Sequence, residues 1–236
     1  MSAGQSMAEL IIALDSKDSA TALALARRLR PWVSWFKVGL ELFISAGPGI
    51  VGALKDQDAN VFLDLKLYDI PNTAAQAALA CARLQADLLT VHCQGGLAMC
   101  EAVAAALGPL SWAPRVVGVT VLTSFKSSEL PGMAGSADEH VACLAAIAAK
   151  AGLYGVVCSA AEAARIGQIA PGLARVCPGI RPQGSDRHDQ ARTVTPKAAV
   201  ANGADYLVVG RPVTRASDPV AATVAILDEM KNGGEI

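Results

Sequence analysis

Three charged residues interrupt an otherwise apolar segment in the first third of the chain. Asp64 and Lys66 lie two residues apart, and Asp69 follows in the turn before Pro71. Residues two apart on a strand face the same side of a sheet, so the first two charges are expected to share one face. The residues expected on the opposite face are Val61, Leu63, Leu65 and Leu67. Since an unpaired buried charge is costly, the segment should either face solvent or build a paired site in which a carboxylate holds an ammonium group.

Polar residues also end or interrupt the other apolar runs. In chain order these are Asp15, Lys37, His92, Thr123 with Ser124, Ser159, Arg181, and Gly210 with Arg211. The carboxyl ends of parallel strands meet on one face of a barrel, where barrel enzymes place their sites. Eight such ends converge in space only if the strands close on themselves, so this distribution predicts a site at one end of a barrel.

Eight short apolar runs, rich in Val, Ile and Leu, alternate with helical spacing. The predicted strands are Glu9–Asp15, Trp35–Gly39, Asn60–Lys66, Asp87–His92, Val116–Leu122, Gly155–Ser159, Arg175–Pro178 and Asp205–Gly210. Helical spacing is seen in Ser19–Leu29, Thr73–Gln85, Ala98–Ala106, Asp138–Lys150, Ala160–Ile169 and Pro196–Asn202. This order predicts an α/β fold, a single (β/α)8 TIM barrel domain over residues 1–236. An open doubly wound sheet is the structural alternative, but no Gly-x-Gly-x-x-Gly dinucleotide motif follows the first strand.

Composition narrows the class of protein. The chain has 236 residues, of which 53% are hydrophobic and 17% charged, and its net charge is −1. We therefore expect a globular protein without general attraction to nucleic acid or to anionic membrane. The start of the sequence lacks a signal-peptide pattern, and the six cysteines are scattered without a Cys-x-x-Cys pair. Both features predict reduced thiols, no zinc site and a cytoplasmic location.

Two glycine-containing segments predict an anion site. Gly210, Arg211 and Pro212 follow the eighth run and open a predicted helix, while Gly179 and Arg181 follow the seventh. Barrels often bind phosphate in the loops after these two strands, through backbone N–H groups, a helix N-terminus and a guanidinium group. The longest irregular segment, 179–196, lies beside them and is expected to cover a substrate.

Simpler structural roles compete with these interpretations. Asp15, Thr73 and Ser159 each fit the pattern of a helix cap, and Lys37 could lie on an exposed edge. Asp64 and Lys66 could form only a structural ion pair, and His92 is better explained as structural than as a base. Arg211 could pair with Asp218 on the surface.

The segment 64–73 resembles the signature of the orotidine 5'-phosphate decarboxylase family of bacterial type. The family pattern Asp-x-Lys-x-x-Asp-Ile-x-x-Thr is matched by Asp64, Lys66, Asp69, Ile70 and Thr73 without a departure. The resemblance continues through Asp15, Lys37, Leu122-Thr123-Ser124, Pro178-Gly179-Ile180-Arg181 and Val209-Gly210-Arg211. A loop glutamine of the family corresponds to Gln190, with Gln183 as a second candidate.

The resemblance implies a reaction and a role for each matched residue. The family removes CO2 from orotidine 5'-phosphate to give uridine 5'-phosphate, the last step of de novo pyrimidine nucleotide synthesis, without metal or organic cofactor. Lys66 is the expected proton donor, within an alternating array of Lys37, Asp64, Lys66 and Asp69. Asp15 and Lys37 would hold the ribose, Thr123 and Ser124 the nucleotide, and Arg181, Gly210, Arg211 and Gln190 the phosphate. The family also implies a homodimer in which Asp69 and Thr73 reach the partner's site.

Three other functions use the same residue types. A related sugar-phosphate decarboxylase or aldolase would require magnesium, and a Schiff-base aldolase would use Lys37 or Lys66 covalently. A non-catalytic nucleotide-phosphate binding protein belongs to a different class. It would have no need of an ammonium group framed by carboxylates.

Overall fold

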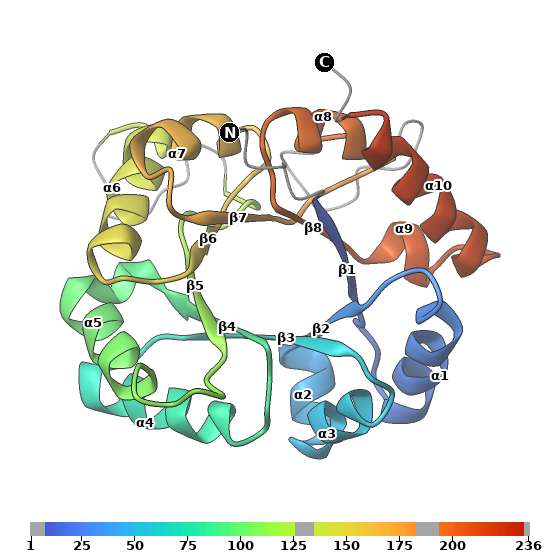
Figure 1. Cartoon of the computed structure of the whole chain (residues 1–236), viewed down its shortest axis with the longest axis horizontal. Coiled ribbons are helices and arrows are strands. Elements are labelled where there is room, and N and C mark those ends of the chain that lie inside the picture. The colour runs from blue at the N-terminus through green and yellow to red at the C-terminus, as the bar shows by residue number, and fades with distance from the viewer. Residues whose placement is uncertain (1–7, 126–134, 183–193, 234–236) are drawn as a thin grey trace.

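Eight parallel strands form a closed barrel in this computed structural model, which describes residues 8–125, 135–182 and 194–233. Each strand pairs with the next in sequence, and the eighth pairs with the first (Figure 1). The strands are β1 (Glu9–Ala13), β2 (Trp35–Gly39), β3 (Asn60–Leu67), β4 (Leu88–His92), β5 (Arg115–Val119), β6 (Gly155–Val157), β7 (Ala174–Cys177) and β8 (Tyr206–Val209). The predicted (β/α)8 barrel is thus confirmed, and the open doubly wound sheet is excluded because such a sheet has unpaired edges.

Helices surround the strands as an outer ring (Figure 1). They are α1 (Ser19–Leu29), α2 (Leu40–Ala46), α3 (Gly49–Lys55), α4 (Pro71–Ala82), α5 (Gly96–Leu107), α6 (Ala137–Lys150), α7 (Ala163–Ile169), α8 (Pro196–Ala201), α9 (Arg211–Thr214) and α10 (Pro219–Lys231). A 3-10 turn, Cys93–Gly95, precedes α5. The sequence spacing predicted the bounds of β2 and α1 correctly and those of the other predicted elements to within a few residues.

The connection from β2 to β3 contains two short helices, α2 and α3, which the spacing of apolar residues did not predict. Gly47 ends α2 with φ of +71°, in the left-handed region that glycine enters without strain. Pro48 follows directly and cannot continue the preceding helix, because it lacks the backbone N–H. This Gly-Pro pair therefore separates α2 from α3.

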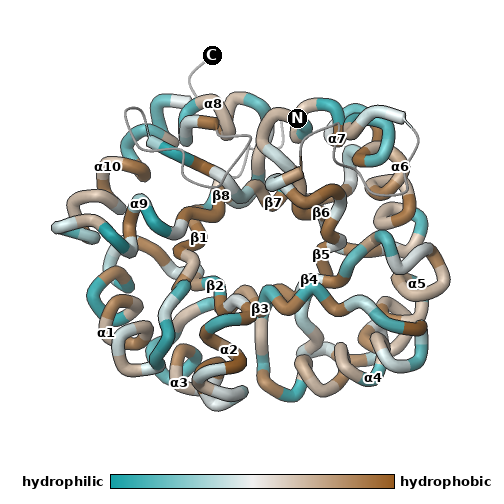
Figure 2. The backbone as a smooth tube through the Cα atoms, turned by 180° about the vertical axis from the view of Figure 1, so that it is seen from behind, coloured by the Kyte–Doolittle hydropathy of each residue, from teal (hydrophilic) through white to brown (hydrophobic). Residues whose placement is uncertain are grey.

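Two apolar layers hold the barrel together. The larger lies between strands and helices and includes Val61 and Leu63 of β3, both fully buried. The smaller fills the barrel interior and is formed by Ile11, Ala13, Trp35, Phe62, Leu88, Val117, Val176, Tyr206 and Val208. Strands covered on both faces are expected to be hydrophobic along their length, and Figure 2 shows the inner ring of strands mostly in brown.

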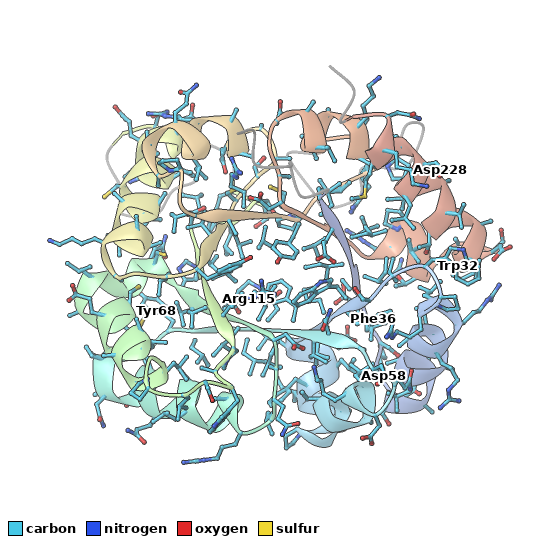
Figure 3. All side chains as sticks on the ribbon, viewed as in Figure 1. Trp32, Phe36, Asp58, Tyr68, Arg115 and Asp228 are labelled. Atoms are coloured by element: carbon cyan, nitrogen blue, oxygen red, sulfur yellow. The ribbon has the colours of Figure 1, made fainter. Side chains whose placement is uncertain are left out.

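Aromatic and charged side chains close the N-terminal end of the barrel. Arg115, at the start of β5, lies over the rings of Trp35 and Tyr154, at 5.5 and 4.6 Å from their centroids. Figure 3 shows Arg115 inside the ring of strands. At the same end, Lys55 pairs with Asp87 at 2.8 Å, and this carboxylate also accepts from the N–H of Val61 at 2.7 Å. Filling one end leaves the opposite, C-terminal end for a cavity.

The cysteines bear on the prediction of reduced thiols. All six cysteines are free, and all but Cys143 are buried, as expected for small core residues. Among the described helices, none combines the length and apolar character needed to cross a bilayer.

Candidate functional site

A cavity of about 300 Å³ opens at the C-terminal ends of the strands. Its walls contain most of the residues that the sequence singled out. These are Asp15, Lys37, Asp64, Lys66, Thr123, Ser124, Arg181, Gly210 and Arg211. Apolar residues complete the lining, among them Phe62, Val119, Val157 and Val208. The predicted convergence is therefore confirmed for six strand ends. His92, the last residue of β4, and Ser159, after β6, do not line the cavity.

Four charged side chains form a connected group, which we call the charged cluster: Asp15, Lys37, Asp64 and Lys66. The Asp64 carboxylate lies at its centre, with Oδ1 at 2.8 Å from Lys66 Nζ and Oδ2 at 3.5 Å from Lys37 Nζ. Lys37 Nζ is also 3.4 Å from Asp15 Oδ1. The side chains of Lys37 and Asp64 are only 12% and 13% exposed, so the exposed-edge explanation for Lys37 is wrong. Each of these two shielded charges would be costly alone and is stabilised by its oppositely charged neighbours.

The carboxylate of Asp64 stays ionised because of its neighbours. Burial by itself would raise its pKa, but the positive charges of Lys37 and Lys66 oppose this. Hydrogen bonds from Lys66 and Thr90 add to the same effect, so the pKa of Asp64 lies below its ordinary value of 3.8.

The backbone around Lys66 departs from regular strand geometry. The β3–β4 register runs from Leu63 opposite Leu89 to Leu67 opposite Val91, so the ladder shifts between these points. Lys66 has φ of +52°, in a region that costs a residue with a side chain roughly 1–2 kcal/mol. Such strain often accompanies a functional site, and here it lies at the residue with the predicted chemical role.

Glycine is required at the end of β2. A Cβ atom on Gly39 would lie 2.8 Å from Lys37 Nζ and 3.5 Å from Asp15 Oδ1. Any side chain at this position would therefore occupy the place where the charged cluster meets. The absence of a side chain lets Lys37 lie inward between two carboxylates.

Two guanidinium groups, of Arg181 and Arg211, line the part of the cavity next to the C-terminal ends of β7 and β8. Arg181 is 7% exposed and its Nη1 donates to the carbonyl of Ile180 at 2.8 Å. Gly210 caps α9, which begins at Arg211 and has only four residues. A helix this short has little macrodipole. Anion binding here would therefore depend mainly on the guanidinium and backbone N–H groups, and less on the helix N-terminus than the sequence suggested. Asp218, the surface partner suggested for Arg211, pairs with Arg28 at 2.9 Å.

The proposed helix-cap roles are also replaced. Asp18, rather than Asp15, caps α1 by accepting from the N–H of Thr21 at 2.8 Å. The cap position of α4 belongs to Ile70, and Thr73 lies inside that helix. Ser159 precedes α7 without occupying its cap position, which is Glu162. Each prediction had the right residue type near a helix start but missed the start itself by a few residues.

Two residues of the charged motif stay outside the cavity of their own chain. Asp69 and Thr73 are both exposed, and Asp69 Oδ1 accepts from the neighbouring N–H of Ile70 at 2.7 Å. Figure 3 places Tyr68, just before them, outside the ring of strands. Gln183 and Gln190 lie outside the described residues.

Thr90 of β4 is hydrogen-bonded to the charged cluster, although it was not among the residues predicted from the sequence. This residue is fully buried, accepts from the N–H of Lys66 at 2.7 Å and donates to Asp64 Oδ1 at 3.1 Å. The available signal was weak, because a lone threonine in an apolar strand is common in any sheet. Within residues 8–125, 135–182 and 194–233, no group of three or more His, Cys, Asp or Glu side chains could hold a metal ion.

Comparisons with known proteins agree over nearly the whole chain. The model of the family described as "Orotidine 5'-phosphate decarboxylase / HUMPS family" matches residues 8–226. The orotidine 5'-phosphate decarboxylase of Sodalis glossinidius is 47% identical over 99% of this chain and 94% of its own. The crystal structure of the enzyme of that name from Lactobacillus acidophilus has a TM-score of 0.80, 35% identity, and coverage of 94% and 99%. The enzyme from Methanocaldococcus jannaschii, complexed with the inhibitor BMP, has a TM-score of 0.76, 25% identity, and coverage of 95% and 99%.

Gly39→Ala is expected to lower catalytic efficiency by about tenfold or more, since small displacements of positioning groups carry large costs in rate. Its effect on stability should be small, because the added methyl group meets the mobile end of a lysine. The measurements are kcat/KM and the urea-unfolding midpoint. Gly49→Ala at the start of α3 is the matched control, because nothing lies within 4 Å of its Cβ position. Unchanged kcat/KM in Gly39→Ala would show that Lys37 need not lie where the structure has it.

His92 is expected to make the folded state less stable as the pH falls. Burial first, and then the charge of Lys66, lower the pKa of His92 from its ordinary value of 6.5. The unfolded chain therefore takes up the proton at higher pH than the folded chain, so the stability that His92 contributes is present above about pH 6.5 and is lost below it.

The variant His92→Phe removes this titration and keeps a ring against Tyr68, whose centroid is 5.5 Å from that of His92. Urea unfolding at about pH 7.5 and 5.5 should show a smaller loss of unfolding free energy in the variant than in the wild type. An equal loss in both proteins would mean that His92 does not carry the effect.

Proposed function

The chain belongs to the orotidine 5'-phosphate decarboxylase / HUMPS family, and we propose that Lys66 supplies the proton in its reaction. That reaction converts orotidine 5'-phosphate to uridine 5'-phosphate and CO2, which makes the chain a carboxy-lyase of pyrimidine nucleotide synthesis. The observation that carries the proposal is the ammonium group of Lys66, which faces the cavity at 2.8 Å from the ionised carboxylate of Asp64.

The proposed chemistry needs only this chain's own charges. The bond between C6 and the carboxylate breaks, CO2 leaves, and the electron pair stays on C6 of the pyrimidine ring. The nearby ammonium of Lys66 stabilises this pair and then donates a proton from Nζ, which forms the C6–H bond; solvent restores the lysine. Asp64 near the substrate carboxylate would also disfavour the bound ground state, but we assign the larger effect to preorganised charge.

The remaining cavity residues fit the rest of the substrate. Asp15 and Lys37, beside the reacting centre, would hold the ribose hydroxyls. Arg181, Gly210 and Arg211 would bind the phosphate, since two guanidinium groups suit its geometry. Thr123 and Ser124 after β5 would contact the nucleotide. The inhibitor-bound enzyme from M. jannaschii, with a TM-score of 0.76, supports a ligand site of this kind.

A homodimer would complete the site. Asp69 and Thr73 are exposed in one chain, and apolar side chains flank Asp69, with Tyr68 60% and Ile70 67% exposed. Exposed apolar groups beside an exposed carboxylate favour coverage by another protein surface. We propose that this surface is a second copy, and that Asp69 and Thr73 reach the partner's cavity and place a second carboxylate beside Lys66.

The sequence identity to named relatives and the contacts of the Asp64 carboxylate both argue against the rival functions. The family description includes HUMPS, but relatives at 47% identity over nearly the full length are named orotidine 5'-phosphate decarboxylase. A magnesium-dependent reaction would need carboxylates available to the metal, whereas Asp64 is bonded to Lys66 and Thr90 and lies 3.5 Å from Lys37. We therefore propose that no metal takes part.

Lys66→Ala is expected to lower kcat by at least about a thousandfold, because both charge stabilisation and proton donation are lost. Loss of the orotate ultraviolet absorbance measures the rate, with a chelator present throughout. Lys55→Ala is the matched control, since it breaks a Lys–Asp pair of the same 2.8 Å length at the other end of β3.

Activity of Lys66→Ala within tenfold of the wild type would rule out Lys66 as the proton donor. Loss of wild-type activity in the chelator would instead favour the magnesium-dependent relatives. Borohydride trapping of a substrate adduct would favour the Schiff-base aldolase.

Mixing Lys66→Ala with Asp69→Ala is expected to restore activity that neither variant has alone. In a mixed dimer one site takes Lys66 from one chain and Asp69 from the other, so random exchange should recover about a quarter of the wild-type sites. Activity is followed after mixing, and subunit exchange is verified by mass-tagged chains. Proven exchange without recovery would contradict a shared site.

A further inference from the structure

Thr90 occupies the gap that the irregularity in β3 leaves in the ladder. One residue of β4 lies between Leu89 and Val91, whereas residues 64–66 of β3 lie between their partners Leu63 and Leu67. The N–H of Lys66 therefore has no regular ladder carbonyl opposite it. It donates instead to Thr90 Oγ1 at 2.7 Å. A side-chain oxygen thus replaces a backbone acceptor at the point where the strand is distorted.

The hydroxyl of Thr90 both accepts one hydrogen bond and donates another. It accepts from the backbone N–H of Lys66 and donates its single proton to Asp64 Oδ1 at 3.1 Å. The same Oδ1 accepts from Lys66 Nζ at 2.8 Å. These three bonds form a closed ring that holds Lys66 at its backbone and at its ammonium group. Because Thr90 is fully buried, water cannot readily take its place.

We propose that Thr90 is a positioning residue, which holds Lys66 in its left-handed conformation and so aims the ammonium group at the reacting carbon. The inference rests on the proposed role of Lys66 as the proton donor. Thr90 does not line the cavity, so it acts through Lys66 and Asp64 without contact with the substrate. Its loss should therefore slow the chemical step while ribose and phosphate binding remain.

The expected signature is a fall in kcat with little change in KM. Thr90→Val keeps the shape of the side chain and removes both hydrogen bonds, and should lower kcat by about tenfold or more. Thr90→Ser keeps the hydroxyl and should recover most of that loss. The affinity for uridine 5'-phosphate, which lacks the carboxylate, should stay within about threefold of wild type in both variants.

Thr120→Val, directly after β5, is the matched control. Thr120 is also fully buried, and its hydroxyl donates to the carbonyl of Val157 at 2.9 Å without touching the charged cluster. It should therefore lose stability without the tenfold fall in kcat. If Thr90→Val does not fold, Thr90→Ala replaces it, because it removes the same two bonds without adding a methyl group beside a carboxylate.

Three results would overturn the inference: kcat within twofold of wild type in a folded Thr90→Val or Thr90→Ala, equal damage in Thr90→Ser, or an equal fall in Thr120→Val. Failure of the proposed function is a separate outcome, because it would appear as activity in Lys66→Ala. An inactive Lys66→Ala beside a fully active Thr90→Val would refute only the role of Thr90.

Discussion

The buried carboxylate of Asp64 is the group on which the rest of the site depends. It lies 2.8 Å from one ammonium group and 3.5 Å from another, in a part of the molecule where charges are shielded from water. Without it, Lys66 would lose the carboxylate that it contacts and Lys37 would keep only Asp15, which is unfavourable for charges shielded from water. With it, the positive charge is fixed before substrate arrives, so little reorganisation is needed during the reaction.

The barrel places its stabilising contacts at the N-terminal end and in the interior, and its charged cavity at the C-terminal end. The N-terminal end is closed by stacked side chains and the Lys55–Asp87 pair, and the interior is filled with apolar groups. The C-terminal end can then tolerate a left-handed lysine and several buried charges. Local strain of this kind persists only where the surrounding structure over-determines it.

The amino-acid sequence was sufficient to predict the barrel and most of the cavity wall. Eight strands alternating with helices favour a closed barrel, in which the C-terminal ends of the strands meet on one face, and residues from six of the eight ends line the cavity there. It could not predict that Lys66 leaves regular strand geometry or that Thr90 compensates, because both depend on the register of β3 against β4. Helix caps were misassigned for a related reason: a cap depends on the residue at which the helix begins, and composition fixes this only to within a few residues. The placement of Asp69 beside Lys66 depends on a second chain and remains a prediction.

The site as described requires the side-chain nitrogen of Lys66 to be held against the carboxylate of Asp64, 2.8 Å away, in the resting protein. The most direct measurement is the ¹⁵N NMR signal of Lys66 Nζ in lysine-labelled protein, assigned by its absence in Lys66→Ala. We expect the chemical shift of an ammonium group at neutral pH, with slowed proton exchange that becomes fast in Asp64→Asn. The shift of a neutral amine in the wild type would contradict it.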